Sequence, residues 1–321
     1  MNEENLIKQD IELQKIDKDL FQFVEVDDRK SEVIETPEYS YWGSVFKKFF
    51  SSKVAIFMLT ILILVLAMSF IHPLISGYDH LDQQHINDHS KRFLKPSLEN
   101  PFGTDSVGRP VFDMVWAGAR TSLMISFTTT FITITLGLIV GTIWGFNKKL
   151  DFYLMDIYNI ISNIPYLLIV ILLSYTLGPG VWQLIFALSV TSWFGFAYFM
   201  RVQVLIIRDR EYNMASRVLG SSTLKIIKNN ILPQLISVLV TSIASRLPAY
   251  VSTEVFLGFI GLGLSEKEAS LGRTIQNHAQ YMTSEPYLFL IPVTIIAIIS
   301  VSLYIVGQTL ADASDPRNHE I

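Results

Sequence analysis

The sequence contains no cysteine among its 321 residues, which excludes disulfide bonds, thiolate zinc sites and a thiol nucleophile. Several motifs of enzyme chemistry are also missing. No Gly-x-x-x-x-Gly-Lys-Ser/Thr phosphate loop occurs, so the chain cannot bind ATP in that way itself. Neither His-Glu-x-x-His nor Gly-x-Ser-x-Gly occurs, which removes two signatures of hydrolases. We predict that the chain is not an enzyme and holds no catalytic, cofactor-binding or metal site.

The six histidines do not share the spacing of metal ligands on one helix. Three of them, His80, His85 and His89, fall close together after the first apolar run. We interpret these three as solvated side chains of a loop, and contact with a metal ion is the alternative.

Half of the residues are hydrophobic, and they are gathered into long runs with few charges. Such runs are typical of membrane spans. The first run begins too far from the N-terminus for a typical secretory signal, so we predict a retained span. The runs predict an all-α membrane protein with six transmembrane helices near residues 54–71, 122–146, 153–177, 181–200, 236–259 and 287–306.

The basic residues predict the orientation of these spans. Lys47, Lys48 and Lys53 lie just before the first span. The most basic loop separates the fourth and fifth spans, and its cations are Arg201, Arg208, Arg210, Arg217, Lys225 and Lys228. Positive charge favours the cytoplasmic side, so both observations place this loop, the N-terminus and the C-terminus in the cytoplasm. Basic loops also bind nucleic acid, but charge beside lipid headgroups explains this one more simply.

Two segments precede the first span. Residues 1–40 are rich in acidic side chains, which favours a solvated cytoplasmic tail, with contact to a cytoplasmic partner as the alternative. Residues 41–53 carry aromatic and aliphatic residues on one helical face, with lysines on the other sides. This pattern predicts an amphipathic helix in the membrane interface.

Three spans contain residues that demand an explanation. Gly137, Gly141 and Gly145 recur at every fourth position, a pattern that lets a neighbouring helix approach closely. Pro165 should kink the third span. Arg246 and Glu254 are charges within the fifth span, too far apart for a direct pair.

The basic loop of about residues 201–233 predicts two short helices. Asp209 can cap the first helix, and Gly220 can end it in a left-handed conformation. Ser221 or Ser222 can cap the second, and Pro233 marks the next element. A short helix with small residues and an apolar edge can enter a groove of another protein, although an ordinary connecting loop is the alternative.

The same stretch, from Glu211 to Pro233, resembles the coupling loop of ABC importer permeases. That family has a Glu-Ala-Ala-x-x-x-Gly motif followed by Ile-x-Leu-Pro. The residues that match it are Ala215, Gly220, Leu232 and Pro233, whereas Met214, Ser216 and Asn230 depart from it. In the family this loop docks in a cleft of a cytoplasmic ATPase, which implies that role for Glu211, Ala215, Ser216, Gly220, Leu232 and Pro233.

A second segment resembles the Gly-Thr-Asp-x-x-Gly-Arg-Asp motif of the peptide and nickel subgroup of these permeases. Its residues are Gly103, Thr104, Asp105, Gly108 and Arg109, and Pro110 stands where Asp is common. It falls in an external loop predicted over about residues 76–120. Glu254 is similar to a carboxylate of the same subgroup, with either a gating role in the pathway or a structural role between subunits. The ending 307–317 also resembles this subgroup, with departures at Gln308 and Ala311.

The resemblance covers about residues 50–317 and implies the type I ABC importer permease fold, here the C-type permease subunit of an oligopeptide importer. It implies half of a transmembrane pathway in a bacterial cell membrane. The implied partners are a second homologous permease, two cytoplasmic ATPases that use ATP and Mg, an external substrate-binding protein and a peptide substrate. A dipeptide or nickel importer is the alternative. An ion-driven secondary transporter is less favoured, since we see no internal repeat.

Overall fold

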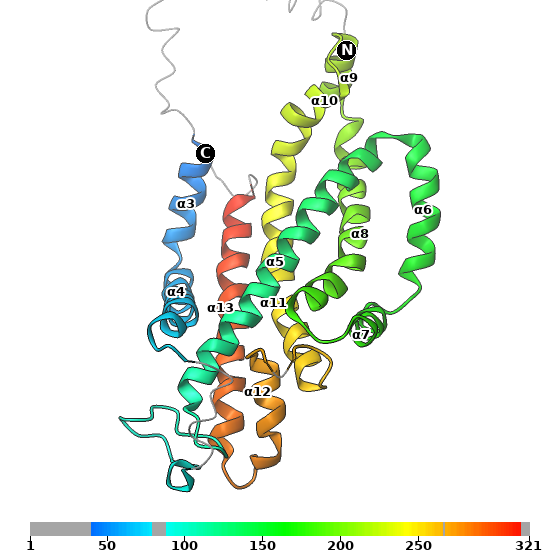
Figure 1. Cartoon of the computed structure of the whole chain (residues 1–321). Helices are drawn as coiled ribbons and strands as arrows, with labels where there is room; N and C mark the ends of the chain where they lie inside the picture. Colours follow the sequence, from blue (N-terminus) through cyan, green and yellow to red (C-terminus); the bar gives the residue numbers. More distant parts are fainter. Residues whose placement is uncertain (1–39, 79–87, 266, 316–321) are drawn as a thin grey trace, which may run out of the picture. The chain divides into compact units, whose positions relative to one another are not determined.

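The computed structural model describes residues 40–78, 88–265 and 267–315, and its regular elements are all helices (Figure 1). Except for Ser40, the acidic tail predicted over residues 1–40 lies outside the described residues, as do His80, His85 and the end of the chain from residue 316. The helices are α3 (Tyr41–Ser51), α4 (Lys53–Ile75), η2 (His89–Lys91), α5 (Val111–Phe146), α6 (Lys148–Ser162), α7 (Tyr166–Leu177), α8 (Val181–Arg208), α9 (Glu211–Val218), α10 (Thr223–Ile226), the π-helical turn η3 (Ile227–Ile231), α11 (Leu232–Phe259), α12 (Leu271–His278), η4 (Ala279–Tyr281) and α13 (Pro286–Ser314).

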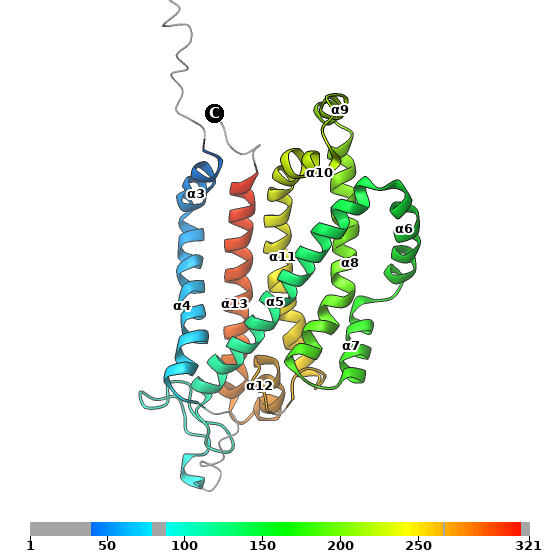
Figure 2. The ribbon, with the colours of Figure 1, turned by 45° about the horizontal axis from the view of Figure 1, so that its top comes forward.

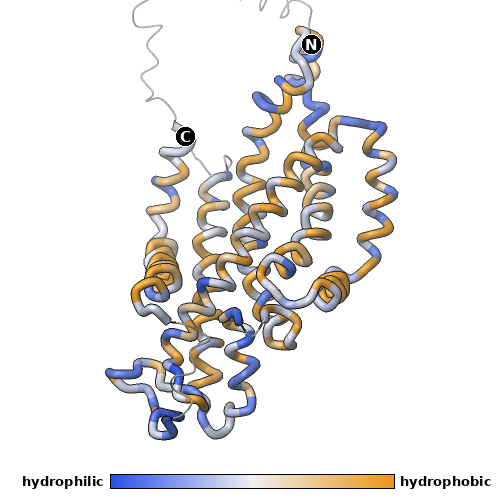
Figure 3. Tube along the Cα trace, viewed as in Figure 1, coloured by the Kyte–Doolittle hydropathy of each residue, from blue (hydrophilic) through white to orange (hydrophobic). Residues whose placement is uncertain are grey.

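Five helical segments are long and apolar enough to cross a membrane: α4, α5, α8, the continuous rod from α10 to α11, and α13. A sixth span exists if α6 and α7 are counted together. Figure 3 shows the apolar residues along these helices and more hydrophilic residues at their two ends. The all-helical membrane fold predicted from the apolar runs is confirmed.

The two polar ends of the bundle are built from different parts of the chain. In Figures 1 and 2, α9 and α10 lie at one end, together with the last turn of α13. The opposite end holds α12 and the segment that precedes α5. The basic loop therefore lies on one side, which the positive-inside argument makes cytoplasmic, and the Gly-Thr-Asp segment lies on the other.

Helices α5 and α8 pack closely because α5 lacks side chains along the contact. A Cβ atom added to Gly141 would lie 2.7 Å from the Cβ of Met200, and one added to Gly145 would lie 2.7 Å from Cγ1 of Val204. A Cβ added to Gly137 would also clash with α8. The helix contact predicted from the glycine spacing is confirmed, and α8 is the helix that it admits.

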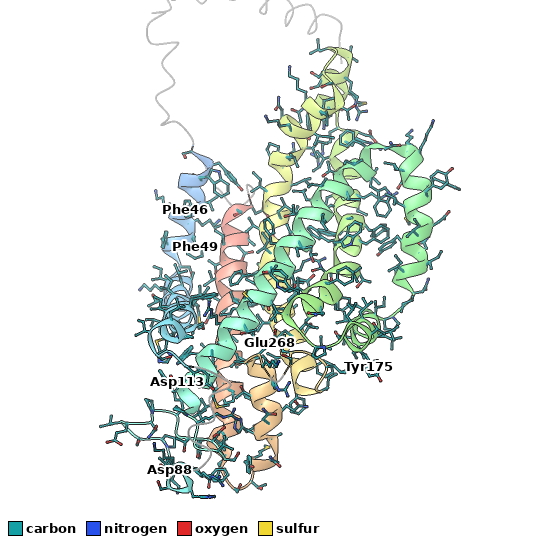
Figure 4. The ribbon with its side chains drawn as sticks, viewed as in Figure 1. Phe46, Phe49, Asp88, Asp113, Tyr175 and Glu268 are labelled. Atoms are coloured by element: carbon teal, nitrogen blue, oxygen red, sulfur yellow. The ribbon has the colours of Figure 1, made fainter. Side chains whose placement is uncertain are left out.

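The central packing joins helices from both halves of the sequence. Its buried side chains come from α4, α5, α11, α12 and α13, and they include Leu62, Val65, Val115, Ala119, Leu247, Val251, Leu271, Leu288, Ile299 and Leu303. On the side of the loop before α5, His72 Nε2 of α4 lies 3.3 Å from Oδ1 of Asp113 on α5, which is labelled in Figure 4. This packing fixes α11 between α5 and α13.

The third predicted span is broken at the expected place. Helices α6 and α7 meet at an angle of 81° across residues 163–165, and Pro165 occupies the N-cap position of α7. The kink predicted at Pro165 is confirmed as a full break. The ring of Pro165 and its missing N–H favour the start of a new helix over continuation of the old one.

Three boundaries differ from the sequence prediction. The external loop, predicted to reach residue 120, ends at Pro110, because α5 starts at Val111 and continues without interruption into the second span. Helix α8 runs to Arg208, so Arg201 belongs to the helix and not to the basic loop. Helix α13 extends to Ser314, beyond the predicted end of the last span near residue 306. Polar residues at helix ends continue the helix into the interface, which a hydropathy pattern alone does not reveal.

The helix predicted over residues 41–53 is present as α3. Its Val45 and Phe49 are buried, whereas Trp42, Phe46 and Phe50 are about half exposed. Figure 4 labels Phe46 and Phe49 on this helix. Its location in a membrane interface stays a prediction.

Candidate functional site

The loop between α8 and α11 folds into the two predicted short helices. Helix α9 ends before Gly220, whose φ of +83° is left-handed, and the amide of Ser221 donates to the carbonyl of Ser216. Ser222 caps α10 by accepting a hydrogen bond from the amide of Lys225. Glycine is favoured at this kind of helix end because a Cβ would be strained there. The predicted roles of Gly220 and Ser222 are confirmed.

The predicted cap by Asp209 is wrong. Arg210 occupies the N-cap position of α9 and provides no side-chain cap. The carboxylate of Asp209 instead lies 2.7 Å from Nη2 of Arg208 and 3.8 Å from Nη1 of Arg217. Hydrogen bonds from Arg208 lower the pKa of Asp209. The neighbouring guanidinium groups attract this carboxylate more strongly than the orphan amides of α9, because a charge-assisted hydrogen bond is the stronger kind.

Two asparagines hold the short helices against α8 and α11. The side chain of Asn213 is fully buried and donates from Nδ2 to the carbonyl of Ile207 at the end of α8 (2.9 Å). Nδ2 of Asn230 donates to Oδ1 of Asn213 (2.8 Å) and lies 3.4 Å from Oγ of Ser216. Asn230 stands where the family motif has Ile, and here its side chain makes a polar link to α9. The sequence analysis missed Asn213, although a polar side chain on the inner face of α9 was its available signal.

The tip of this loop exposes apolar side chains. Val218 is 87% exposed, Leu219 85% and Leu224 78%, and Ala215 is also exposed. We call these four residues the α9–α10 tip. Helix α10 continues through η3 into α11 as one rod from Thr223 to Phe259, so a displacement of the tip would be passed directly to α11.

The Gly-Thr-Asp segment at the opposite end is a compact hydrogen-bonded turn. Asp105 is fully buried, and its Oδ1 accepts hydrogen bonds from the amides of Val107 (2.9 Å) and Arg109 (2.8 Å). Its Oδ2 lies 2.9 Å from Nε of Arg109. Gly103 and Gly108 both have positive φ angles, +76° and +86°. These contacts explain the two glycines, Asp105 and Arg109 of the motif by local folding, and no catalytic role is needed to account for them.

This turn is attached to α12 and α13. Thr104 Oγ1 donates to the carbonyl of Lys91, and the hydroxyl of Tyr287 donates to the carbonyl of Thr104 (3.0 Å). Nε2 of the buried His278 lies 4.0 Å from Oδ2 of Asp105, while its Nδ1 lies 2.7 Å from the carbonyl oxygen of Thr274. Burial lowers the pKa of His278, although the Asp105 carboxylate opposes this effect.

A further contact at this end joins α8 to the connection between α11 and α12. The carboxylate of Glu268, labelled in Figure 4, accepts hydrogen bonds from the amides of Val181 (3.4 Å) and Ser265 (3.1 Å). The start of α8 is therefore linked to the segment that carries α12.

As predicted, Arg246 and Glu254 do not form an ion pair with each other. Both carboxylate oxygens of Glu254 are buried and accept no hydrogen bond of standard geometry, while the hydroxyls of Ser122 and Ser270 lie beside the group. Glu254 is fully buried within this chain. Its two predicted roles, in gating and in structure between subunits, both stay predictions.

Arg246 faces a different part of the bundle. Its guanidinium lies 4.7 Å from the ring centroid of Phe196 on α8. It borders two open hollows between helices, of about 460 and 330 Å³. The polar residues that line them with Arg246 are Gln203, Ser237, Thr241, Ser242 and Ser245 in the larger hollow, and Tyr166, Thr191, Ser192, Tyr250 and Thr253 in the smaller. We call this surface the polar face of α8 and α11.

Arg201 is part of an aromatic cluster that the sequence analysis missed. Nε of Arg201 lies 2.5 Å from Oδ1 of Asp151 on α6, which also accepts a hydrogen bond from Nε1 of Trp144 (2.8 Å). The rings of Tyr158 and Tyr198 stack with centroids 3.9 Å apart. This cluster fastens α6 to α5 and α8, so it positions the broken span. In the described ranges, no group of three or more His, Asp or Glu side chains is arranged to hold a metal ion.

Comparisons with known proteins decide the family. The profile described as "Binding-protein-dependent transport system inner membrane component" matches residues 133–320. The chain belongs to this permease family. A second profile, "N-terminal TM domain of oligopeptide transport permease C", matches residues 40–96. The permease is thus a transport subunit of an ABC system, a multi-pass protein of a bacterial membrane, and not an enzyme.

Curated relatives match nearly the whole permease. It is 53% identical to the oligopeptide transport system permease protein AmiD of Streptococcus pneumoniae, over 95% of this chain and 99% of that protein. It is 33% identical to the dipeptide transport system permease protein DppC of Bacillus subtilis, over 90% of each chain. The similarity therefore covers both the Gly-Thr-Asp segment and the α9–α10 loop.

Solved structures share the fold. The permease matches a chain of the MetNI methionine ABC transporter in an inward-facing conformation with a TM-score of 0.54 and 20% identity, covering 64% of this chain and 99% of that one. This likeness supports the ABC importer permease architecture predicted from the loop motif.

Proposed function

We propose that the permease forms half of the transmembrane pathway of an ATP-driven oligopeptide importer and couples that pathway to cytoplasmic ATPases. The observation that carries the coupling role is the α9–α10 tip, which projects apolar side chains and whose α10 part continues into α11 without a break. Exposed apolar side chains on a short helix favour docking in a groove of another protein. The assignments of Glu211, Ala215, Ser216, Gly220, Leu232 and Pro233 to this contact are part of the proposal.

The substrate class rests on the relatives. AmiD of Streptococcus pneumoniae is an oligopeptide permease and shares half of its residues with this chain, whereas DppC of Bacillus subtilis, a dipeptide permease, shares a third. Oligopeptides are therefore favoured, and dipeptides are the second candidate.

The complete importer requires other chains. We infer a second homologous permease, two ATPases that use ATP and Mg, and an external substrate-binding protein. Binding of ATP would close the ATPase pair, and the α9–α10 tip would transmit this motion to α11. The Gly-Thr-Asp segment and α12, at the other end, would face the binding protein, and α3 would lie in the cytoplasmic membrane interface.

The first experiment is an affinity purification of the tagged permease in mild detergent, followed by mass spectrometry. Recovery of a second permease and of ATPases that carry phosphate loops is the expected result. Vesicles reconstituted with these chains and the binding protein should accumulate a labelled oligopeptide only with ATP. A permease that purifies alone, without ATPase activity, would contradict the proposal.

A pair of variants tests the tip itself. Leu219→Asp should reduce recovery of the ATPases by about tenfold or more, because a charge replaces a leucine that would be buried on docking. Leu98→Asp is the matched control, since Leu98 is fully exposed in the segment before α5, far along the chain from the tip. Equal recovery from both variants would refute docking through the tip.

A further inference from the structure

Arg246 lies near the middle of α11 and lacks a counter-ion in the part of the chain that the structure describes. The side chain is half-buried, and no described carboxylate oxygen lies within 4.0 Å of it. Its contact with Phe196 holds the guanidinium over an aromatic face, which does not neutralise the charge. A cation within a membrane span is costly unless it faces water or an anion. The guanidinium of Arg246 could therefore bind an anion, and the described residues do not provide one.

Glu254 does not provide that anion. It lies on the same helix, but its carboxylate is fully buried beside Ser122 of α5 and Ser270 at the start of α12. Arg246 instead borders the hollows between α8 and α11. The two charged residues of this span thus lie in separate environments.

A regular row of hydroxyl groups lies on the same helix as Arg246. Ser237, Thr241, Ser245 and Thr253 recur on one face of α11 at multiples of four residues, and all four border the hollows. Each hydroxyl of Thr241, Ser245 and Thr253 donates to a carbonyl one turn earlier in its own helix. Their oxygen lone pairs remain able to accept hydrogen bonds, so the row offers acceptors to the amide groups of an extended chain.

We propose that Arg246 binds the C-terminal carboxylate of the peptide during its passage along the polar face of α8 and α11. This inference rests on the proposed function and adds a recognition site to it. A guanidinium matches a carboxylate with two parallel hydrogen bonds. Every linear peptide carries this carboxylate whatever its side chains are, so one arginine can engage peptides of many sequences.

The hollows give a ligand room to reach the guanidinium of Arg246. Arg246 borders both of them, and their volumes are about 460 and 330 Å³. A ligand that moves past the arginine needs such space. The alternative is an ion pair between Arg246 and a carboxylate of the second permease, and the experiment is designed to detect it.

The experiment measures binding of tritiated tetra-alanine to the assembled importer in nanodiscs without the binding protein. Unlabelled tetra-alanine and its C-terminal amide compete for the site. The wild type should prefer the free acid by about tenfold or more, because the amide loses the charge-assisted hydrogen bonds to the guanidinium. Arg246→Gln should bind the acid and the amide equally, and Arg246→Lys should keep part of the preference. Arg120→Gln, which removes an exposed arginine of α5, should behave as the wild type.

Several outcomes would overturn the assignment. The assignment fails on the wild type alone if the importer binds the free acid and the amide equally, or binds neither. Preference for the acid retained in Arg246→Gln would have the same meaning. Loss of the second permease from purified Arg246→Gln would identify a partner carboxylate as the counter-ion and would also overturn the proposal. ATP-driven uptake of tetra-alanine by the wild type with the binding protein tests the proposed function separately.

Discussion

Replacement of Gly141 by alanine tests whether close approach of α5 and α8 holds the bundle together. The new Cβ would lie 2.7 Å from Cβ of Met200 and 3.1 Å from the carbonyl carbon of Ala197, and it would also clash with the carbonyl oxygen of Ala197. Backbone atoms cannot rotate away, so the two helices must separate. Overpacking costs about 1–3 kcal/mol, and a clash with backbone atoms lies in the upper part of this range, about 2–3 kcal/mol.

Alanine is also the better helix former, which offsets up to about 1 kcal/mol of this cost. The expected net loss for Gly141→Ala is therefore about 1–2 kcal/mol, equivalent to a decrease in Tm of about 2–8 °C. Gly195→Ala on α8 is the matched control, since a Cβ there would meet no atom within 4 Å. That variant should leave Tm unchanged or raise it.

The assay is thermal unfolding of the tagged permease within its purified complex, with both variants prepared in the same detergent. An unchanged Tm for Gly141→Ala would refute the claim that the glycine is required by the helix contact. An equal decrease for Gly195→Ala would show that loss of glycine flexibility, and not the clash with α8, lowers stability.

Three further predictions concern polar contacts. Asp151→Asn removes the carboxylate that pairs with Arg201, a pair whose side chains are 32% and 14% exposed, and should cost about 1–2 kcal/mol after allowance for solvent screening, measured as a lower Tm; an Asn as stable as Asp would contradict a contribution from this ion pair. Asn230→Ala leaves Oδ1 of Asn213 without its donor and should loosen α9, measured as faster hydrogen exchange over Glu211–Val218 while α5 is unchanged; equal exchange in both proteins would contradict the link. His278 has a pKa lowered by burial from 6.5, so below pH 6.5 the unfolded segment takes up a proton more readily than the folded one, and stability falls as pH decreases toward the folded pKa. Proteolysis of the segment that carries α12 should therefore accelerate between pH 7.5 and 5.5, and the same acceleration in His278→Gln would rule out this histidine as the cause.

Much of the candidate site follows from local sequence. Gly220 and Ser222 act on residues within one helical turn, so their residue types alone predict where α9 ends and α10 begins. Asp209 fails as a cap because two arginines compete for its carboxylate, and Arg217, at the far end of α9, lies near it only once that helix has formed. The link from Asn213 to Asn230 joins residues from separate helices, so no local pattern could predict it.

The sequence by itself determined the apolar spans, the basic loop that orients them, the glycine contact face and the break at Pro165. These features depend on hydropathy, charge and backbone geometry, which are properties of a residue and its near neighbours. Only the tertiary structure decided that α8 is the partner of the glycines, that Glu254 is sealed inside the chain, and that Arg246 borders open polar hollows. The physical reason is that burial and the supply of a counter-ion depend on which helices become neighbours, and that choice is made by packing across the whole bundle.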